Sequence, residues 1–210
     1  MSVAKVLKMI KDKEVKFVDL RFTDTKGKWQ HTAQTASTID ENTFKEGIMF
    51  DGSSIAGWKN INESDMILMP DPSTAVIDPF TAQPQMILFC DVIEPSDGKP
   101  YELDPRSTGK KAQDYLKSSG IGDKCFFGPE AEFFVFDDVK WATNQEYTFF
   151  SIDSEEGAYN TGSEMEGGNM GHRPKDKGGY FPVPPVDSAT DIRAEMVSTM
   201  IEMGLDMEKH

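Results

Sequence analysis

Residues 128–136 read Gly-Pro-Glu-Ala-Glu-Phe-Phe-Val-Phe. The apolar residues indicate a β-strand, in which successive side chains alternate between the two faces. Glu130 and Glu132 would then point the same way, about 6–7 Å apart at a rise of about 3.3 Å per residue. Two carboxylates on so apolar a strand repel each other and resist desolvation, and a hard cation such as Mg²⁺ or Mn²⁺ would resolve that conflict. The alternative is an edge strand with a solvated acidic face, and the spacing alone leaves both interpretations open.

Composition bounds the class of protein. The 210 residues suffice for one large domain or two modest ones, and 38% hydrophobic and 10% aromatic residues suffice for a core. The net charge of −14 argues against nucleic acid or an anionic membrane as a partner. Cys90 and Cys125 lie in apolar runs and predict buried thiols in a reducing compartment. Neither a secretory signal nor a membrane span is recognisable, so a cytoplasmic location is expected.

Hydrophobic periodicity predicts a small mixed domain in the first half of the chain. Helical spacing indicates a helix over residues 2–13, and period-two alternation indicates a hairpin over residues 15–22 and 28–36. A second helix is expected at residues 37–45, and further strands at residues 65–69 and 85–93. This order of elements favours an α+β domain with a mixed sheet.

A domain boundary is expected near residues 95–105, where Pro, Gly, Ser and Asp cluster. Asp104 followed by Pro105 predicts the N-cap and first residue of a helix that ends near Ser118. We therefore divide the chain into domains at residues 1–104 and 105–210.

The second domain contains few further elements. Residues 155–180 are rich in glycine and predict a long loop. Residues 187–191 resemble a capping box that opens a helix, for which Gly204 would be the C-cap, and a strand is expected to begin at Leu205. So few elements cannot cover an apolar strand at residues 128–136, which predicts an incomplete domain.

A second informative stretch is Phe-Asp-Gly-Ser-Ser at residues 50–54. Its glycine permits a tight turn, and its hydroxyl and amide groups gather around Asp51. Such a loop would place Asp51 as a general base beside a small polar substrate. The alternative is an ordinary capping turn, because this composition is common in loops.

These two stretches together closely resemble bacterial type I glutamine synthetases. The resemblance runs from residues 50–54 through Asp65 and includes residues 128–134. It also includes residues 15–24, 166–169 and 177–187, so that it covers essentially the whole chain. It implies an α+β fold: a β-grasp-like N-terminal domain, followed by the first part of a catalytic domain built on a curved antiparallel sheet with helices.

The resemblance also implies an activity and the residues that serve it. Enzymes of this family are glutamate–ammonia ligases, which join ammonia to L-glutamate and use ATP to make γ-glutamyl phosphate first. Glu130 and Glu132 match ligands of the divalent metals, Mg²⁺ or Mn²⁺. Asp51 matches the residue that takes a proton from bound ammonium, and Ser54 and Tyr180 match residues that line the ammonium site. The implied substrates are therefore L-glutamate, ammonium and ATP.

The family assembly and the end of the chain complete the expectation. Glu208 matches a position that contacts ATP. The family forms homododecamers of two stacked six-membered rings, in which the loop with Asp51 completes the active site of a neighbouring subunit. The sequence stops at His210, where the family continues with a further metal-binding glutamate, so we expect the N-terminal portion of a synthetase that is inactive alone.

Two other interpretations stay open. The chain could be a non-catalytic truncated subunit that associates with full-length synthetase through the loop with Asp51. It could also belong to a different carboxylate–amine ligase of the same fold, although the sequence at residues 51–54 favours the glutamine synthetase branch.

Overall fold

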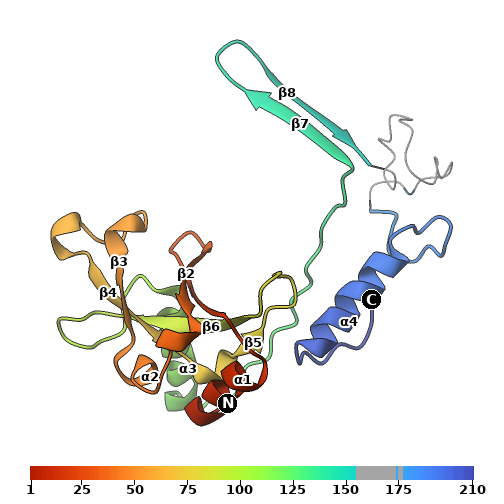
Figure 1. Ribbon diagram of the computed structural model, residues 1–210. Coiled ribbons are helices and arrows are strands. Elements are labelled where there is room, and N and C mark those ends of the chain that lie inside the picture. Colours follow the sequence, from red (N-terminus) through yellow and green to blue (C-terminus); the bar gives the residue numbers. More distant parts are fainter. Residues whose placement is uncertain (155–173, 175–176) are drawn as a thin grey trace. The chain divides into compact units, whose positions relative to one another are not determined.

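The computed structural model describes residues 1–154, 174 and 177–210 (Figure 1). The chain divides into two compact units, Met1–Phe127 and Gly128–His210, and each is described by itself. Both contain helices and antiparallel strands, so the predicted α+β class is confirmed. None of the helices in the described ranges is both long enough and apolar enough to cross a bilayer.

The first unit is built on a six-stranded mixed sheet. Its strands are β1 (Phe17–Thr23), β2 (Trp29–Thr35), β3 (Ile48–Asp51), β4 (Asp65–Pro70), β5 (Val76–Ile77) and β6 (Gln85–Ile93). They follow the order β2-β1-β6-β4-β3, and β5 pairs with β6. Strands β1 and β6 run parallel, whereas the other pairs are antiparallel. The mixed sheet and its hairpin β1–β2 therefore agree with the prediction, and β3 lies at one edge.

Period-two and helical spacing create the core. Val18, Leu20 and Phe22 share one face of β1 and are almost fully buried, as alternation along a strand requires. Helix α1 (Val3–Asp12) contributes Val6 and Ile10 to the same core, and the side chain of Ser2 caps its first turn. These residues confirm the predicted first helix and first strand.

The predicted helix at residues 37–45 is instead two short pieces, the 3₁₀ turn η1 (Ala36–Thr38) and helix α2 (Thr43–Glu46). The side chain of Asp40 separates them. Its Oδ1 accepts hydrogen bonds from the backbone amides of Asn42 (2.8 Å) and Thr43 (3.1 Å). An aspartate that binds nearby amides in this way competes with a continuous helix.

Helix α3 (Pro105–Ser118) is fastened to the sheet of the first unit. The buried carboxylate of Asp104 accepts hydrogen bonds from the amides of Arg106 (3.0 Å) and Ser107 (3.2 Å), and from the amide of Val92 in β6 (3.3 Å). One side chain therefore caps the helix and joins it to a strand, as the Asp-Pro sequence predicted for the cap. The compact units separate after Phe127; a domain boundary at residues 104/105 remains a prediction.

The second unit contains the antiparallel hairpin β7 (Asp138–Thr143) and β8 (Thr148–Asp153) and the helix α4 (Thr190–Glu202). The hairpin was not predicted. Helix α4 was predicted, but its start differs: Ala189 is the N-cap, and the carboxylate of Asp187 accepts hydrogen bonds from the Ala189 amide (3.1 Å) and the Thr190 hydroxyl (2.6 Å). Gly204 follows the helix with a positive φ of 91°, which glycine adopts without strain.

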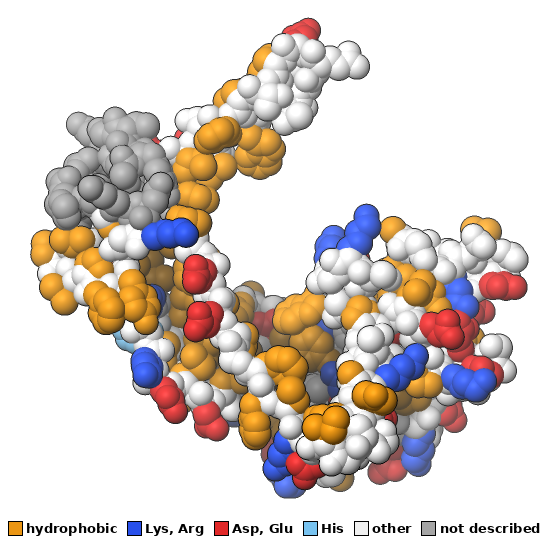
Figure 2. All heavy atoms as spheres, turned by 180° about the vertical axis from the view of Figure 1, so that it is seen from behind, with side chains coloured by type: hydrophobic (Ala, Val, Ile, Leu, Met, Phe, Trp, Pro, Cys, Tyr) orange, Lys and Arg blue, Asp and Glu red, His pale blue; other side chains and the backbone are white. Residues whose placement is uncertain are grey.

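Residues 128–136 form no β-strand, so that prediction was wrong, and so was the strand expected from Leu205. A strand forms where a neighbouring backbone completes its hydrogen-bond ladder. Among the described residues of this unit, β7 and β8 pair with each other. Phe133 and Phe134 are 58% and 71% exposed, and Figure 2 shows hydrophobic side chains at the surface. Cys90 is buried as predicted, but Cys125 is exposed.

Candidate active site

Asp51 is the last residue of β3, and its carboxylate is held by the turn that follows, η2 (Gly52–Ser54). Its Oδ1 accepts hydrogen bonds from the amide (2.8 Å) and the hydroxyl (2.6 Å) of Ser53. Its Oδ2 accepts a long one from the Ser54 hydroxyl (3.4 Å). The pKa of Asp51 is lowered because hydrogen bonds stabilise its anion. The largest cause is the Ser53 hydroxyl, followed by the Ser53 amide and the hydroxyls of Ser64 and Ser54. The structure thus brings together two of the predicted site residues, Asp51 and Ser54.

Strand β4 closes the loop that follows Asp51. The Gly52 amide donates to the Ser64 carbonyl (2.7 Å), and Asp51 lies opposite Asp65 in the β3–β4 register. Side chains opposite each other in an antiparallel pair share a face, and like charges there are unfavourable. Sequences keep such unfavourable pairs chiefly at functional sites. A bound cation would relieve the repulsion.

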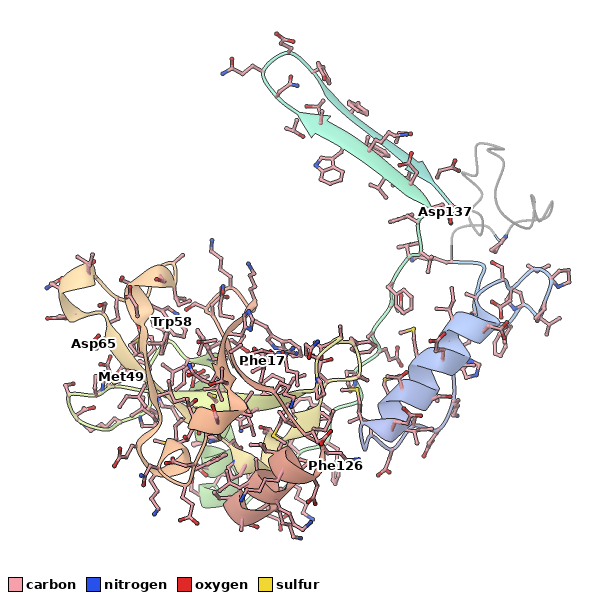
Figure 3. All side chains as sticks on the ribbon, viewed as in Figure 1. Phe17, Met49, Trp58, Asp65, Phe126 and Asp137 are labelled. Atoms are coloured by element: carbon pink, nitrogen blue, oxygen red, sulfur yellow. The ribbon has the colours of Figure 1, made fainter. Side chains whose placement is uncertain are left out.

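Trp58 anchors the loop to the core (Figure 3). It is 8% exposed, its Nε1 donates to the Thr25 hydroxyl (2.8 Å), and its carbonyl accepts from the Tyr101 hydroxyl (3.1 Å). Its ring lies 5.1–6.4 Å, centroid to centroid, from the rings of Tyr101, Phe22 and Phe50. Sequence reasoning missed this anchor; the signal was a lone tryptophan in a loop of small and polar residues.

Gly52 is required by close packing rather than by its backbone angles. A Cβ at this position would lie 2.5 Å from Sδ of Met66 and 3.1 Å from the carbonyl oxygen of Ser64. Met66 is fully buried and has little room to withdraw. A Cβ here would therefore force Met66 or the backbone at Ser64 to shift where the loop turns back beside β4.

Replacing Gly52 by alanine is expected to lower the free energy of unfolding by about 1–3 kcal/mol, the usual cost of overpacking a core. Urea denaturation would measure it. Gly109→Ala is the matched control: a Cβ there meets nothing within 4 Å in helix α3, so a gain of about 0.5–1 kcal/mol is expected from helix propensity. Wild-type stability in Gly52→Ala would contradict the packing described.

Glu130 and Glu132 are exposed in the irregular segment before β7. Carboxylate oxygens suit Mg²⁺ or Mn²⁺, so the donor type fits the predicted metal. The described part of the chain contains no group of three side chains placed to hold a metal ion. Two carboxylates would need water or substrate oxygens to complete the coordination, and the metal role of both stays a prediction.

The remaining predicted residues are exposed. The Tyr180 ring, 87% exposed, makes an edge contact with the Phe181 ring at 4.5 Å. Glu208 follows α4 in a segment without regular structure. The roles of Tyr180 and Glu208 therefore stay predictions. Residues 166–169, part of the resemblance, lie outside the described residues.

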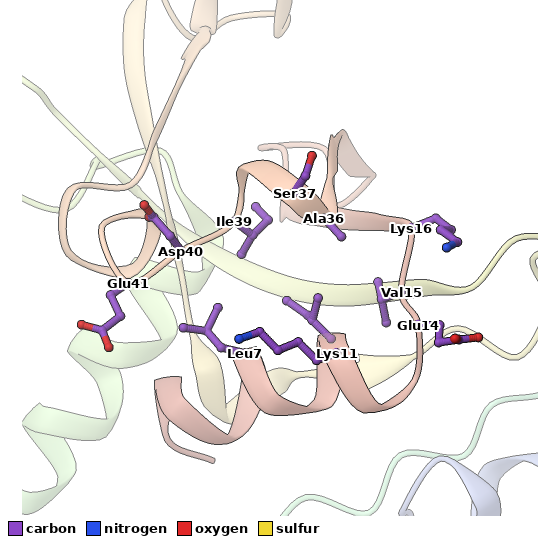
Figure 4. Close-up of a pocket in the computed structure, with 11 residues that line it drawn as sticks. Leu7, Lys11, Glu14, Val15, Lys16, Ala36, Ser37, Ile39, Asp40 and Glu41 are labelled. Atoms are coloured by element: carbon purple, nitrogen blue, oxygen red, sulfur yellow. The ribbon is translucent and has the colours of Figure 1, made fainter.

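The surface of the first unit is hollowed at the following two places, among others. The larger, of about 600 Å³, lies between α1 and residues 36–41 and contains none of the predicted site residues (Figure 4). The second, of about 450 Å³, is lined by Ser64 and Asp65 and by Lys59, whose ammonium pairs with Glu94. It lies at the β4 end of the loop that holds Asp51.

Comparisons with known proteins give the family. Residues 14–95 match the model of the glutamine synthetase β-grasp domain, and residues 102–210 match that of the glutamine synthetase catalytic domain. The chain is 60% identical over 209 residues to the glutamine synthetase of Azospirillum brasilense and 58% identical over 210 residues to that of Escherichia coli K12. Each alignment covers 100% of this chain and 45% of the relative, so the chain spans just under half the length of these relatives.

A cryo-EM structure of Plasmodium falciparum glutamine synthetase has a similar fold. The TM-score is 0.82 at 23% identity, with 100% of this chain and 41% of that chain covered. At this identity the likeness concerns the fold alone. The two family models together span nearly the whole sequence, one matching the β-grasp domain and the other the catalytic domain, of which this chain contains a part. The chain therefore belongs to the glutamine synthetase family.

Proposed function

We propose that this chain contributes the ammonia-handling loop and part of the metal site to a glutamine synthetase, a ligase that makes glutamine from L-glutamate, ammonium and ATP. The observation that carries the proposal is the geometry at Asp51. An exposed, ionised carboxylate stands at a strand end, with hydroxyls around it and a second carboxylate, Asp65, opposite. Such a site attracts a small cation that can donate hydrogen bonds, as ammonium does.

Asp51 acts in this proposal as the base. The carboxylate accepts a proton from ammonium, and the electron pair of the broken N–H bond stays on nitrogen. Neutral ammonia then attacks the γ-carbon of γ-glutamyl phosphate, and phosphate departs with the electron pair of the C–O bond. The newly bonded nitrogen loses a second proton to the departing phosphate or to water, which leaves the amide of glutamine. The hydroxyl oxygen of Ser54 accepts a hydrogen bond from ammonium beside Asp51, and the hydroxyl oxygen of Tyr180 would be a further acceptor for ammonium.

In this proposal, residues of the second unit serve phosphoryl transfer from ATP. Glu130 and Glu132 would hold Mg²⁺ or Mn²⁺, which neutralises phosphate charge and orients the phosphoryl group when bound. Glu208 would contact ATP. The net charge of −14 suits a protein that binds cations rather than nucleic acid or anionic membranes. We place the protein in the cytoplasm.

The assembly we propose is that of the family, a homododecamer of two six-membered rings in which the Asp51 loop faces the active site of a neighbouring subunit. Strand β3 supports this, because it lies at the edge of the sheet and ends at Asp51. The same position favours a second proposal, in which this chain associates with full-length subunits through that edge without catalysing the reaction itself.

A comparison of two polypeptides tests the proposal. Residues 1–210 alone are expected to form no glutamine from ATP, glutamate and ammonium, because they span 45% of the Azospirillum relative. A chimaera of residues 1–210 joined to the rest of that relative is expected to form it, with the Azospirillum enzyme as the control. Ammonia consumption by residues 1–210 alone that depends on ATP and glutamate would refute the expected inactivity. A chimaera that folds and assembles but makes no glutamine would refute the proposed function.

A further inference from the structure

Two aspartates of the first unit bind the turn after them in the same way. In both aspartates, Oδ1 accepts hydrogen bonds from the amide and from the hydroxyl of the serine two residues later. For Asp51 and Ser53 these distances are 2.8 and 2.6 Å. For Asp71 and Ser73 they are 2.9 and 2.6 Å. The first unit thus contains the same carboxylate clamp at Asp51 and at Asp71.

The two clamps differ at the other oxygen. Oδ2 of Asp71 accepts from the Arg106 guanidinium, so its charge is used to fasten helix α3. Oδ2 of Asp51 receives the long hydrogen bond of the Ser54 hydroxyl, 3.4 Å, and the Ser64 hydroxyl also stabilises the carboxylate. No ion pair of the described residues includes Asp51. Because no cation of the described residues neutralises Asp51, Oδ2 can accept a hydrogen bond from a cationic molecule outside the turn.

We propose that Ser53 is a positioning residue: its amide and hydroxyl fix Oδ1 of Asp51 so that Oδ2 is the oxygen that takes the proton from ammonium. This rests on the proposed function of Asp51. In the step, the N–H bond breaks, its electron pair stays on nitrogen, and the proton forms an O–H bond at Oδ2. The carboxylic acid later returns the proton to water.

The physical reason lies in the freedom of a carboxylate. Its terminal torsion is broad, so an exposed aspartate samples many orientations. Two short hydrogen bonds to one oxygen fix the plane of the group and aim the other oxygen. Charge-assisted hydrogen bonds are strong enough for this task, and correct orientation of a base relative to its proton contributes directly to rate.

The pKa of Asp51 is lowered, as expected for a carboxylate whose anion is held by the hydrogen bonds of the clamp. Hydrogen bonds to the anion lower the pKa, and the Ser53 hydroxyl is the largest cause. At pH values above the ordinary carboxyl pKa, Asp51 is ionised and these hydrogen bonds stabilise it fully. This stabilisation is lost as the pH falls through the lowered pKa of Asp51. Removal of the hydroxyl therefore raises the pKa of Asp51.

The test joins a measurement on residues 1–210 with one on the chimaera. In Ser53→Ala, the pKa of Asp51, followed by ¹³C NMR of its carboxyl and assigned with Asp51→Asn, is expected to rise. In the chimaera, Ser53→Ala is expected to lower kcat with ammonium about tenfold, the equivalent of one charge-assisted hydrogen bond. Hydroxylamine is largely unprotonated at neutral pH and needs no base, so its kcat should change little. Ser53→Thr keeps the hydroxyl and should restore both values.

The controls separate this role from a structural one. Ser73→Ala removes the same hydroxyl from the other clamp and is expected to leave the pKa of Asp51 and the ammonium-to-hydroxylamine ratio unchanged. An unchanged pKa of Asp51 in Ser53→Ala overturns the inference, as does an equal loss with both nucleophiles. Those results leave the proposed function intact if the wild-type chimaera makes glutamine. A wild-type chimaera that makes none overturns the proposed function and the inference together.

Discussion

Replacing Asp51 by asparagine is expected to lower kcat/KM for ammonium in the chimaera by about 10²–10⁴, the usual contribution of a positioned general base. Asparagine keeps the shape of the side chain and one oxygen that Ser53 can bind, but it cannot accept a proton at neutral pH. Steady-state kinetics with ammonium as the varied substrate would measure the loss.

Asp97→Asn is the matched control for this substitution. Asp97 also accepts a hydrogen bond from the amide two residues later, Lys99 at 3.0 Å, and lies in an exposed turn. Its replacement changes the same charge away from β3, so wild-type kinetics are expected. A comparable loss in both variants would show that net charge, not the base, is responsible.

Replacing Trp58 by alanine is expected to lower the free energy of unfolding of the first unit by about 3–5 kcal/mol, as for other large aromatic residues in cores. The change removes the ring contacts with Phe22, Phe50 and Tyr101. It also removes the Nε1 hydrogen bond to Thr25. Urea denaturation followed by far-ultraviolet circular dichroism would measure the loss.

Two further variants divide this effect into its causes. Trp58→Phe keeps an aromatic ring but loses the indole donor, so a cost of about 1 kcal/mol or more is expected. Trp141→Ala removes a tryptophan that is 72% exposed on β7 and should change stability little. Equal, small effects of Trp58→Ala and Trp141→Ala would refute the anchoring role of Trp58.

Local patterns predicted the first unit well. The hairpin β1–β2, strand β6 and helices α1 and α3 follow from periodicity and from a cap that the chain encodes within a few residues. The short edge strand β3 was missed. Its residues 48–51 are too few for a period, and its pairing with β4 depends on contacts far along the chain.

The error at residues 128–136 has a different cause. Apolar alternation shows that a segment is suited to a strand, but a strand also needs a partner, and periodicity carries no information about partners. The prediction that Cys125 is buried was wrong for the same reason, because an apolar run is buried only where another element covers it.

The residues of the candidate site also differ in how far the local sequence could predict them. Asp51 and Ser54 meet because they lie within one turn, so a short motif was enough to predict their proximity. Trp58 stands out as a lone tryptophan in a loop of small and polar residues, but its contacts come from distant segments that its neighbours in sequence do not indicate. Glu130 and Glu132 were proposed as metal ligands from their spacing on an expected strand and then from the resemblance, whereas Tyr180 and Glu208 came from the resemblance alone; the roles of all four remain proposals.

The most direct test of the account is the ratio of glutamine formed from ammonium to γ-glutamyl hydroxamate formed from hydroxylamine, measured in the wild-type chimaera and in Asp51→Asn. If Asp51 is the base, the ratio falls by about 10² or more, since only ammonium must lose a proton before it can attack. A ratio equal to that of the wild type would contradict the assignment of Asp51 as the base.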